Sequence, residues 1–250
     1  MTLAAEPFQW PERRRGAVSL SFDDARPSQL DRCIPLLNSH GVRATFYVSL
    51  PNMNQRLGEW KDVIESGHEI GNHTVSHPCS GNFKWSRSRA LEDYTLERME
   101  AEFVEANGEI ERALGVRPQT FAYPCGQKFV GRGEKTESYV PLVARFFLAG
   151  RGFRDEAPND PAFCDPAQLA AVDGDCLTFK QYRVWLERTA AEGGWLILAG
   201  HDVGEAPTQC VRPAALDSLC RYCLDPANGL WIDTVEAVAR WTEDGKCISM

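Results

Sequence analysis

Short apolar runs alternate with amphipathic segments of helical period along almost the whole chain. This order favours a parallel sheet, because parallel strands need a long connection and a helix supplies it. Polar residues follow several of the apolar runs, which is typical of an α/β barrel with its site at one end. We expect strands at 17–22, 44–50, 69–71, 120–123, 152–154, 169–172 and 195–199, helices at 27–40, 89–114, 139–149, 178–191, 212–224 and 234–242, a short helix around Trp60, and loops at 126–138 and 154–166.

The bulk composition excludes several classes of protein. The chain has 250 residues, 43% of them hydrophobic, so it can bury a full core. Its formal net charge of -8 would repel a phosphate backbone, so we expect no nucleic-acid partner. No stretch approaches the ~18 apolar residues of a membrane span, and residues 1–11 lack a charged leader followed by an apolar core. We therefore expect a cytoplasmic protein with no membrane partner, and we leave its oligomeric state open.

The chain contains nine cysteines, an odd number. Without an export signal, reduced thiols are the expected state. Cys220 and Cys223 form a CxxC pair in a segment whose apolar residues recur at helical spacing. We interpret this pair as part of a buried helix face, because no second pair completes the four ligands of a structural zinc site.

Polar side chains follow the predicted strands at the points where those strands end. In a parallel α/β barrel the carboxyl ends of the strands meet at one face, and the site lies there. The sequence therefore predicts a functional site built from these strand ends. The residues concerned are Asp23 and Asp24, His73 and His77, residues 123–126, and His201 and Asp202.

The segment from His73 to His77 places two imidazoles four residues apart. With one carboxylate they make a His2Asp set, which suits a divalent transition metal with an open coordination position. The spacing alone is a weak signal, since single histidines are often surface or helix-cap residues. The adjacent Asp23 and Asp24 strengthen the case for a metal site. Two neighbouring carboxylates suggest different roles, one binding metal and the other taking a proton from water. In the alternative, Asp24 caps the helix that begins near Pro27.

Four motifs occur in order along the chain: SFDD at 21–24, HTVSH at 73–77, FAYPCG at 121–126, and a late apolar strand followed by His201. The ordered set, which spans 17–202, resembles the motifs of the polysaccharide deacetylase family, carbohydrate esterase family four with its NodB-homology domain. The resemblance implies a distorted (β/α)7 barrel and a single domain over 1–250. It also implies a metal-dependent hydrolase that removes an N-acetyl group from a carbohydrate.

The resemblance implies a role for each motif residue as well. The expected metal is zinc, although cobalt, nickel or iron would suit the same ligands. The expected partner is an N-acetylated sugar, oligosaccharide or polysaccharide. By motif, Asp23 corresponds to the general base, His201 to the general acid, Asp24, His73 and His77 to the metal ligands, and Tyr123, Pro124 and Cys125 to the substrate and oxyanion turn, with the Cys125 N–H as donor.

Several positions depart from the family pattern. Ala122 stands where the family commonly has an arginine that orients the base, and Arg151 is the expected replacement. Cys125 replaces the tyrosine of the same motif. No Asp-x-x-Asp-Trp motif is present, which leaves Asp173 and Asp175 as the candidates for its place.

Trp85 lies in a polar stretch shortly after His77, where it could stack on a sugar ring. Two other functions stay open beside the deacetylase. Relatives of this fold hydrolyse small cyclic or linear non-sugar amides, some of them without metal. A chain that has lost catalysis could instead serve as a carbohydrate-binding or scaffolding protein.

Overall fold

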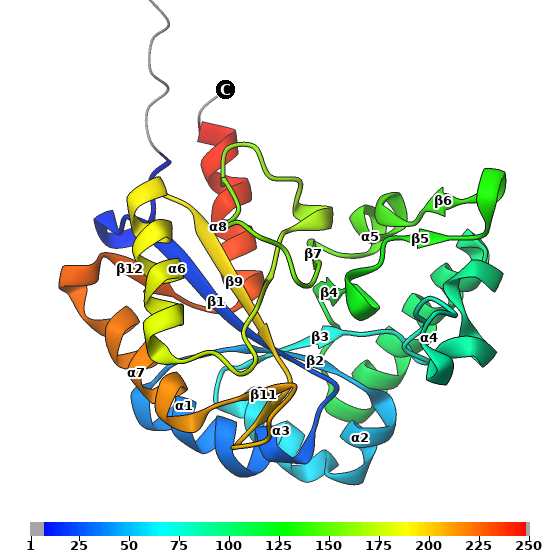
Figure 1. Ribbon diagram of the computed structural model, residues 1–250, viewed down its shortest axis with the longest axis horizontal. Coiled ribbons are helices and arrows are strands. Elements are labelled where there is room, and N and C mark those ends of the chain that lie inside the picture. Colours follow the sequence, from blue (N-terminus) through cyan, green and yellow to red (C-terminus); the bar gives the residue numbers. More distant parts are fainter. Residues whose placement is uncertain (1–7, 249–250) are drawn as a thin grey trace, which may run out of the picture.

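Strand β1 (Gly16–Asp23) lies within the main sheet, and all of its residues are buried. The structure, a computed structural model, describes residues 8–248. β1 pairs in parallel with β2 (Thr45–Val48) on one side and with β9 (Trp195–Gly200) on the other, and Figure 1 shows β1 and β9 running together through the molecule. Parallel strands covered on both faces read as near-continuous apolar runs. The strands predicted at 17–22 and 195–199 are confirmed.

The sheet continues in parallel on both sides of β1 and curls. Its order is β7-β4-β3-β2-β1-β9-β8, and β12 pairs with the start of β1. The two edges meet at the segment leading into β8, where the Leu169 N–H donates to the Gly150 carbonyl of β7 (2.8 Å) and β8 itself pairs with β9. The predicted distorted (β/α)7 barrel is therefore confirmed. The remaining strands of this sheet are β3 (Glu69–Asn72), β4 (Thr120–Ala122), β7 (Ala149–Arg151), β8 (Val172–Asp173) and β12 (Leu230–Ile232).

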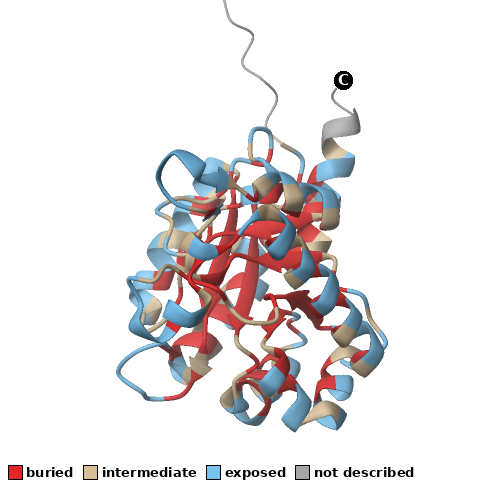
Figure 2. Ribbon diagram, turned by 90° about the vertical axis from the view of Figure 1, so that its right-hand side faces the viewer, coloured by how far each residue is buried: buried red, intermediate tan, exposed pale blue. Residues whose placement is uncertain are grey.

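Helices cover the outside of the sheet, so that the buried strands lie inside and the outer helix faces are exposed (Figure 2). The longest of them, α4, begins after Thr95, whose side chain accepts the Arg98 N–H, and ends at Gly115 with a φ of 78°. Among the helices of residues 8–248, none combines the length and the apolar character that crossing a bilayer requires. The helices are α1 (Ile34–His40), α2 (Leu50–Gln55), α3 (Leu57–Glu65), α4 (Leu96–Leu114), α5 (Val140–Phe146), α6 (Phe179–Glu192), α7 (Pro213–Leu224) and α8 (Val235–Ile248).

Two predicted boundaries near the site are wrong. The helix expected from residue 89 begins at Leu96, because Thr95 caps it and residues 84–93 form two 3-10 turns instead. The strand expected to reach residue 50 ends at Val48. Pro51 explains this second difference, since proline suits the first turn of a helix and lacks the N–H that a strand would use.

The predictions for residues 139–154 are shifted along the chain. The helix ends at Phe146, and the strand expected at 152–154 is β7, three residues earlier. The sequence Ala149-Gly150-Arg151 has no strand-like apolar pattern, but the fold needs a small residue there. A Cβ on Gly150 would lie 2.5 Å from Val143 Cγ1 and 2.9 Å from the Ala167 carbonyl oxygen. The loop expected at 126–138 contains a short antiparallel pair, β5 (Phe129–Val130) and β6 (Glu137–Ser138), which projects from the barrel (Figure 1).

The cysteine predictions have two outcomes. Cys220 and Cys223 are buried on α7 within the main hydrophobic core, as expected of a helix face. The expectation of reduced thiols throughout is wrong, because Cys79 and Cys125 form a disulfide. These two residues are 46 positions apart, and only the fold brings them together.

A buried carboxylate, Glu69, lies at the start of β3. It accepts hydrogen bonds from the Thr120 hydroxyl, the Thr45 hydroxyl (2.7 Å) and the Glu236 N–H (2.9 Å). Burial raises the pKa of Glu69 to about 7, against the opposing effect of these hydrogen bonds. The folded protein therefore holds a proton on Glu69 at a pH where the unfolded chain has already lost it.

This raised pKa sets a pH dependence of stability. A group whose acid form is favoured in the folded state contributes fully below its unfolded pKa, and that contribution is lost as the pH rises toward the folded pKa. We expect the free energy of unfolding to fall between about pH 5 and pH 8, by on the order of 2 kcal/mol from this residue. In Glu69→Gln the decline should be smaller, which urea unfolding at both pH values would show. Parallel pH profiles for the two proteins would contradict the assignment.

Candidate active site

Asp23 is the last residue of β1, and its carboxylate is buried against Arg151. The Arg151 side chain comes from the end of β7, is fully buried, and donates to Asp23 Oδ1. The same guanidinium lies over the ring of Tyr47, 4.6 Å from its centroid. Arg151 therefore contacts Asp23 from β7, the strand next to β4, where Ala122 has no side chain that could do so.

Asp24 reaches the same end of the barrel because the backbone turns there, with a φ of 74° at Asp24. Its Oδ2 accepts from Arg26 Nε (3.2 Å) and Nη2 (3.0 Å). Its Oδ1 lies 3.8 Å from His73 Nε2 and 3.8 Å from His77 Nε2. Burial acts to raise the pKa of Asp24, but the histidines and Arg26 together hold it below its ordinary value. The helix-cap alternative for Asp24 is not supported, since the hydrogen bonds of its carboxylate come from the Arg26 guanidinium and not from a backbone N–H of the helix that begins at Pro27.

His73 and His77 lie on a turn rather than on a helix, with positive φ angles at Thr74 (65°) and His77 (51°). The His73 Nδ1–H donates to the Ala122 carbonyl (2.9 Å), which leaves Nε2 as the free ring nitrogen. Burial, reinforced by His73, lowers the pKa of His77 to about 4, so the imidazole is neutral near pH 7 and able to bind a metal.

Glu102, on α4, stabilises this turn through hydrogen bonds to its backbone. Its carboxylate accepts from the backbone N–H groups of Val75 and Ser76, each at 2.9 Å, and from the Ser76 hydroxyl at 2.6 Å. The Tyr94 hydroxyl donates to it as well (2.9 Å). Sequence reasoning missed Glu102, because nothing in the pattern of α4 distinguishes it from the solvent-facing acids of that helix.

The ligand atoms of Asp24, His73 and His77 fit a divalent metal. All three lie within 4.8 Å of one another. Two ligands that are each ~2.1 Å from a zinc ion at a tetrahedral angle would be about 3.4 Å apart, close to the 3.8 Å separations here. One carboxylate and two imidazoles are also the mixed oxygen and nitrogen donors that catalytic transition-metal sites use.

His201 follows β9 and is buried beside Asp175. Its Nδ1–H donates to Asp175 Oδ2 (2.6 Å), and its backbone N–H donates to Asp175 Oδ1 (3.1 Å). Burial acts to lower the pKa of His201, but Asp175 and the more distant Asp23 raise it overall. Of the two candidate acids, Asp175 therefore orients the histidine, whereas Asp173 pairs with the exposed Arg154.

The turn after β4 presents a backbone N–H rather than side chains. Residues Pro124–Gly126 form one 3-10 turn, and Cys125 has a φ of 54°. N–H groups at the start of such a turn have no partner within it, so the one of Cys125 can serve an oxyanion. Tyr123 is fully buried, and its hydroxyl donates to the Ala167 carbonyl (2.6 Å). Its side chain therefore belongs to the core, and the substrate contact expected of Tyr123 stays a prediction.

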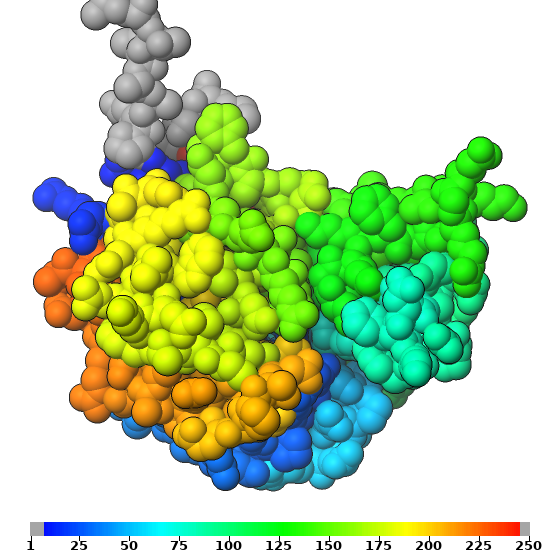
Figure 3. Space-filling view, viewed as in Figure 1, coloured from blue at the N-terminus to red at the C-terminus, as the bar shows by residue number. Residues whose placement is uncertain are grey.

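Trp85 lies at the rim of this cluster. It is 51% exposed, and its ring centroid is 5.8 Å from that of His77 and 5.6 Å from that of Phe83, itself 42% exposed. A cavity of about 420 Å³ lies between the segments near residues 80–92 and 126–131, which are the teal and green surfaces at the right of Figure 3. It is lined by Ser80, Leu91, Glu92, Gly126, Gln127, Lys128, Phe129 and Gly131.

A curled parallel α/β barrel whose acids and histidines gather at its strand ends has its polar groups on the face where the active sites of such barrels lie. The family model described as polysaccharide deacetylase matches residues 11–136, just over half of the chain. The chain belongs to the polysaccharide deacetylase family. Hydrolases of N-acetyl amide bonds make up this family.

Two curated relatives match parts of the chain. A peptidoglycan-N-acetylglucosamine deacetylase of Bacillus cereus is 35% identical over 86 residues, 29% of this chain and 30% of that protein. A gellan lyase of a Bacillus species is 27% identical over 150 residues, 59% of this chain and 5% of that protein. The matches thus span less than a third of the length of these curated relatives.

Solved structures share the fold. One from Mycobacterium smegmatis, classed by name with the polysaccharide deacetylases, superposes with a TM-score of 0.70 at 16% identity and covers 98% of this chain and 96% of that one. The peptidoglycan deacetylase PdaC of Bacillus subtilis gives 0.53 at 16% identity, covering 94% and 95%. At such identities the likeness shows the fold alone.

The buried pair of Asp23 and Arg151 generates a stability prediction. We expect Arg151→Met to lower the free energy of unfolding by about 3–5 kcal/mol, because it leaves the Asp23 carboxylate buried without a counter-charge. Asp23→Asn added to that variant should recover part of the loss. Urea unfolding of the single and double variants measures both effects.

Arg154 offers the matched control. Its side chain is 68% exposed and pairs with Asp173, so Arg154→Met should cost less than about 1 kcal/mol. Similar losses in the two methionine variants, or no recovery from Asp23→Asn, would contradict the importance of the buried pair.

Proposed function

We propose that the protein is a metal-dependent hydrolase that removes the N-acetyl group from an N-acetylated carbohydrate. The convergence of Asp24, His73 and His77 carries this proposal, because their free donor atoms face one another at metal-ligand separations. Membership of the deacetylase family supports the reaction class. The name of the Bacillus cereus relative supports an N-acetylated sugar as substrate.

Asp23 and Cys125 act in the first half of the reaction, the attack of water on the substrate carbonyl. A divalent transition metal held by Asp24, His73 and His77, with zinc our preference, supplies a Lewis acid that polarises the substrate carbonyl and activates water. Asp23 takes a proton from the water as its oxygen attacks the carbonyl carbon. Arg151 keeps the Asp23 carboxylate in place. The Cys125 N–H donates to the oxyanion that develops, in a position prepared by the turn.

The second half falls to His201. Its Nδ1–H is bound by Asp175, so Nε2 is the nitrogen that gives a proton to the departing amine as the carbon–nitrogen bond breaks. The raised pKa of His201 favours the protonated imidazole that this step requires. The products are acetate and a free amino sugar, and the proton taken by Asp23 is returned to solvent.

The rim of the site suits a carbohydrate. Trp85 and Phe83 offer exposed aromatic faces beside His77, and aromatic faces stack on the apolar faces of sugar rings. The cavity of about 420 Å³ between the segments near residues 80–92 and 126–131 is within the size range of small-ligand sites.

We expect purified protein to release acetate from at least one member of a panel of N-acetylated sugars and oligosaccharides, and to lose that activity when a chelator removes its metal. Asp23→Asn should lower the rate by about 10²-fold to 10⁴-fold without removing the metal, as is usual for loss of a general base. Acetate release and metal content by elemental analysis measure the two effects separately. Cleavage only of small non-sugar amides, undiminished by the chelator, would favour the amidase alternative.

Trp85→Ala should weaken substrate binding and leave the chemical step intact. Stacking of an aromatic side chain contributes ~1 kcal/mol, so KM is expected to rise by several-fold to about tenfold with kcat nearly unchanged. Trp241 is 41% exposed and lies on α8, so Trp241→Ala is the matched control. An unchanged KM in the Trp85 variant would remove this residue from the substrate site.

A further inference from the structure

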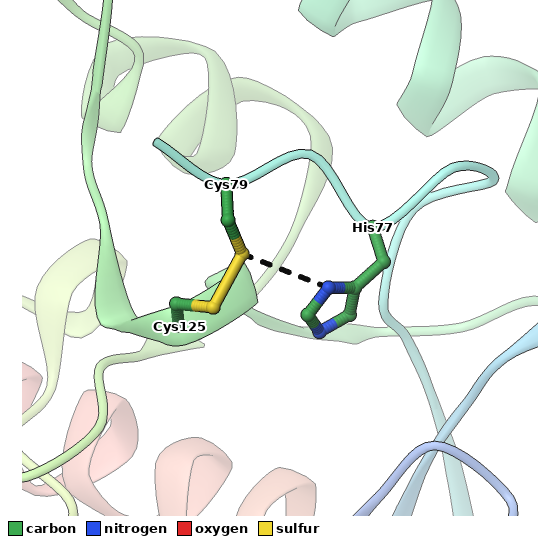
Figure 4. A group of neighbouring side chains, drawn as sticks. All are labelled: His77, Cys79 and Cys125. Atoms are coloured by element: carbon green, nitrogen blue, oxygen red, sulfur yellow. Dashed lines mark hydrogen bonds between the residues drawn. A yellow bond between two sulfur atoms is a disulfide. The ribbon is translucent and has the colours of Figure 1, made fainter. Parts of the chain in front are cut away.

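The Cys79–Cys125 disulfide joins two of the loops that form the site. Cys79 is two residues beyond His77, and Cys125 carries the N–H assigned to the oxyanion. The two Cα atoms are 6.3 Å apart. Figure 4 shows the disulfide beside the His77 ring, with the Cys79 sulfur directed at one of its nitrogens.

His77 lies between two sets of donor atoms and turns a different nitrogen to each. Its Nε2 is 3.8 Å from Asp24 Oδ1 in the His2Asp set. Its Nδ1 is 3.7 Å from Cys79 Sγ. The ligand atoms of His77, Cys79 and Cys125 also lie within 4.8 Å of one another, which is the separation that a shared cation requires.

The chemistry of the second set depends on the oxidation state of its sulfurs. A sulfur in a disulfide is a poor metal ligand, whereas a thiolate is a strong one for soft and borderline cations such as Cd²⁺ and Zn²⁺. We propose that reduction of the Cys79–Cys125 disulfide creates a second metal site, formed by both thiolates and the His77 Nδ1, for a thiophilic divalent cation.

The redox step is a dithiol–disulfide exchange. A thiolate of the reductant attacks the sulfur of Cys125, the more exposed of the two residues, and Cys79 leaves as a thiolate. The second thiol of the reductant then attacks the mixed disulfide and releases Cys125. The reductant ends as a disulfide, and the protein gains two electrons and, before metal binds, two protons.

Hydrogen bonds hold the loops of Cys79 and Cys125 together when the disulfide is reduced. The Ser80 N–H donates to Gln127 Oε1 (2.7 Å), which joins the two loops without sulfur. The Ser86 hydroxyl accepts from the Cys79 N–H and donates to the Cys79 carbonyl, each at 2.9 Å. These contacts keep both thiols next to His77, so a cation can bind without rearrangement of the backbone.

The two sets compete for His77, because one imidazole must be deprotonated to bind metals through both nitrogens. A cation held by the sulfurs therefore weakens the His2Asp set. This last consequence rests on the proposed function, whereas the thiolate site itself does not.

Cadmium binding to the full chain tests the proposal. The protein is stripped of metal, reduced with dithiothreitol, desalted without oxygen and titrated with Cd²⁺, while the ultraviolet thiolate-to-cadmium charge-transfer band is followed. We expect the band in the reduced protein and a much weaker one in the oxidised protein. The oxidised protein is an internal control, because it contains the same thiols of Cys33, Cys220 and Cys223.

Two further samples locate the band. Cys79→Ser/Cys125→Ser should lack it under reducing conditions, whereas Cys220→Ser should retain it. Should the double variant fold poorly, wild-type protein reduced and alkylated with iodoacetamide replaces it, with mass spectrometry to confirm that both residues are modified. A reduced protein with no added band, or a band that survives loss of Cys79 and Cys125, would overturn the proposal. Since none of these readouts uses acetate release, they remain decisive even if the proposed function fails.

Discussion

The buried ion pair between Asp23 and Arg151 is the interaction on which the site depends. β1 and β7 are separated in the sheet by β2, β3 and β4, so the pair crosses the interior of the barrel. A single buried charge would cost several kcal/mol, and each partner is tolerated only because the other is present. Arg151 also lies over Tyr47 of β2. The same contact that neutralises the interior therefore fixes where the proposed base points.

The sequence predicts those parts of the fold and site that local patterns encode. β1 and β9 are apolar runs of ordinary strand length. The acids or histidines that end or follow such a run must therefore lie at a strand end. The position of β7 cannot be predicted in the same way. Ala149 and Gly150 are small because of tertiary packing, which the sequence does not show. Asp175 was one of two candidates on the same segment, and the choice between them depends on which carboxylate the turn after β8 directs at His201.

The turn that carries the two histidines shows a second limit of sequence reasoning. Spacing indicates that His73 and His77 can face one point, but not whether they do so from a helix or a turn. The positive φ angles at Thr74 and His77 are costly for residues with a Cβ, and Glu102 offsets that cost by binding consecutive N–H groups. The disulfide is equally invisible in the sequence, because nine cysteines allow many pairings and only proximity selects one.

Gln29 links the end of β1, which carries Asp23, to the end of β9, which leads into His201. It is fully buried, and its amide donates both to the Asp23 carbonyl (2.6 Å) and to the His201 carbonyl (2.9 Å). Nearby, Arg26 joins Asp24 to Asp202, the residue after His201. Because β1 and β9 are neighbours, these bridges fix the spacing of the proposed base and acid just beyond the last paired residues. A substrate held between the proposed base and acid then finds both groups already in position. A rigid barrel lowers the entropic cost of positioning the reacting groups in this way.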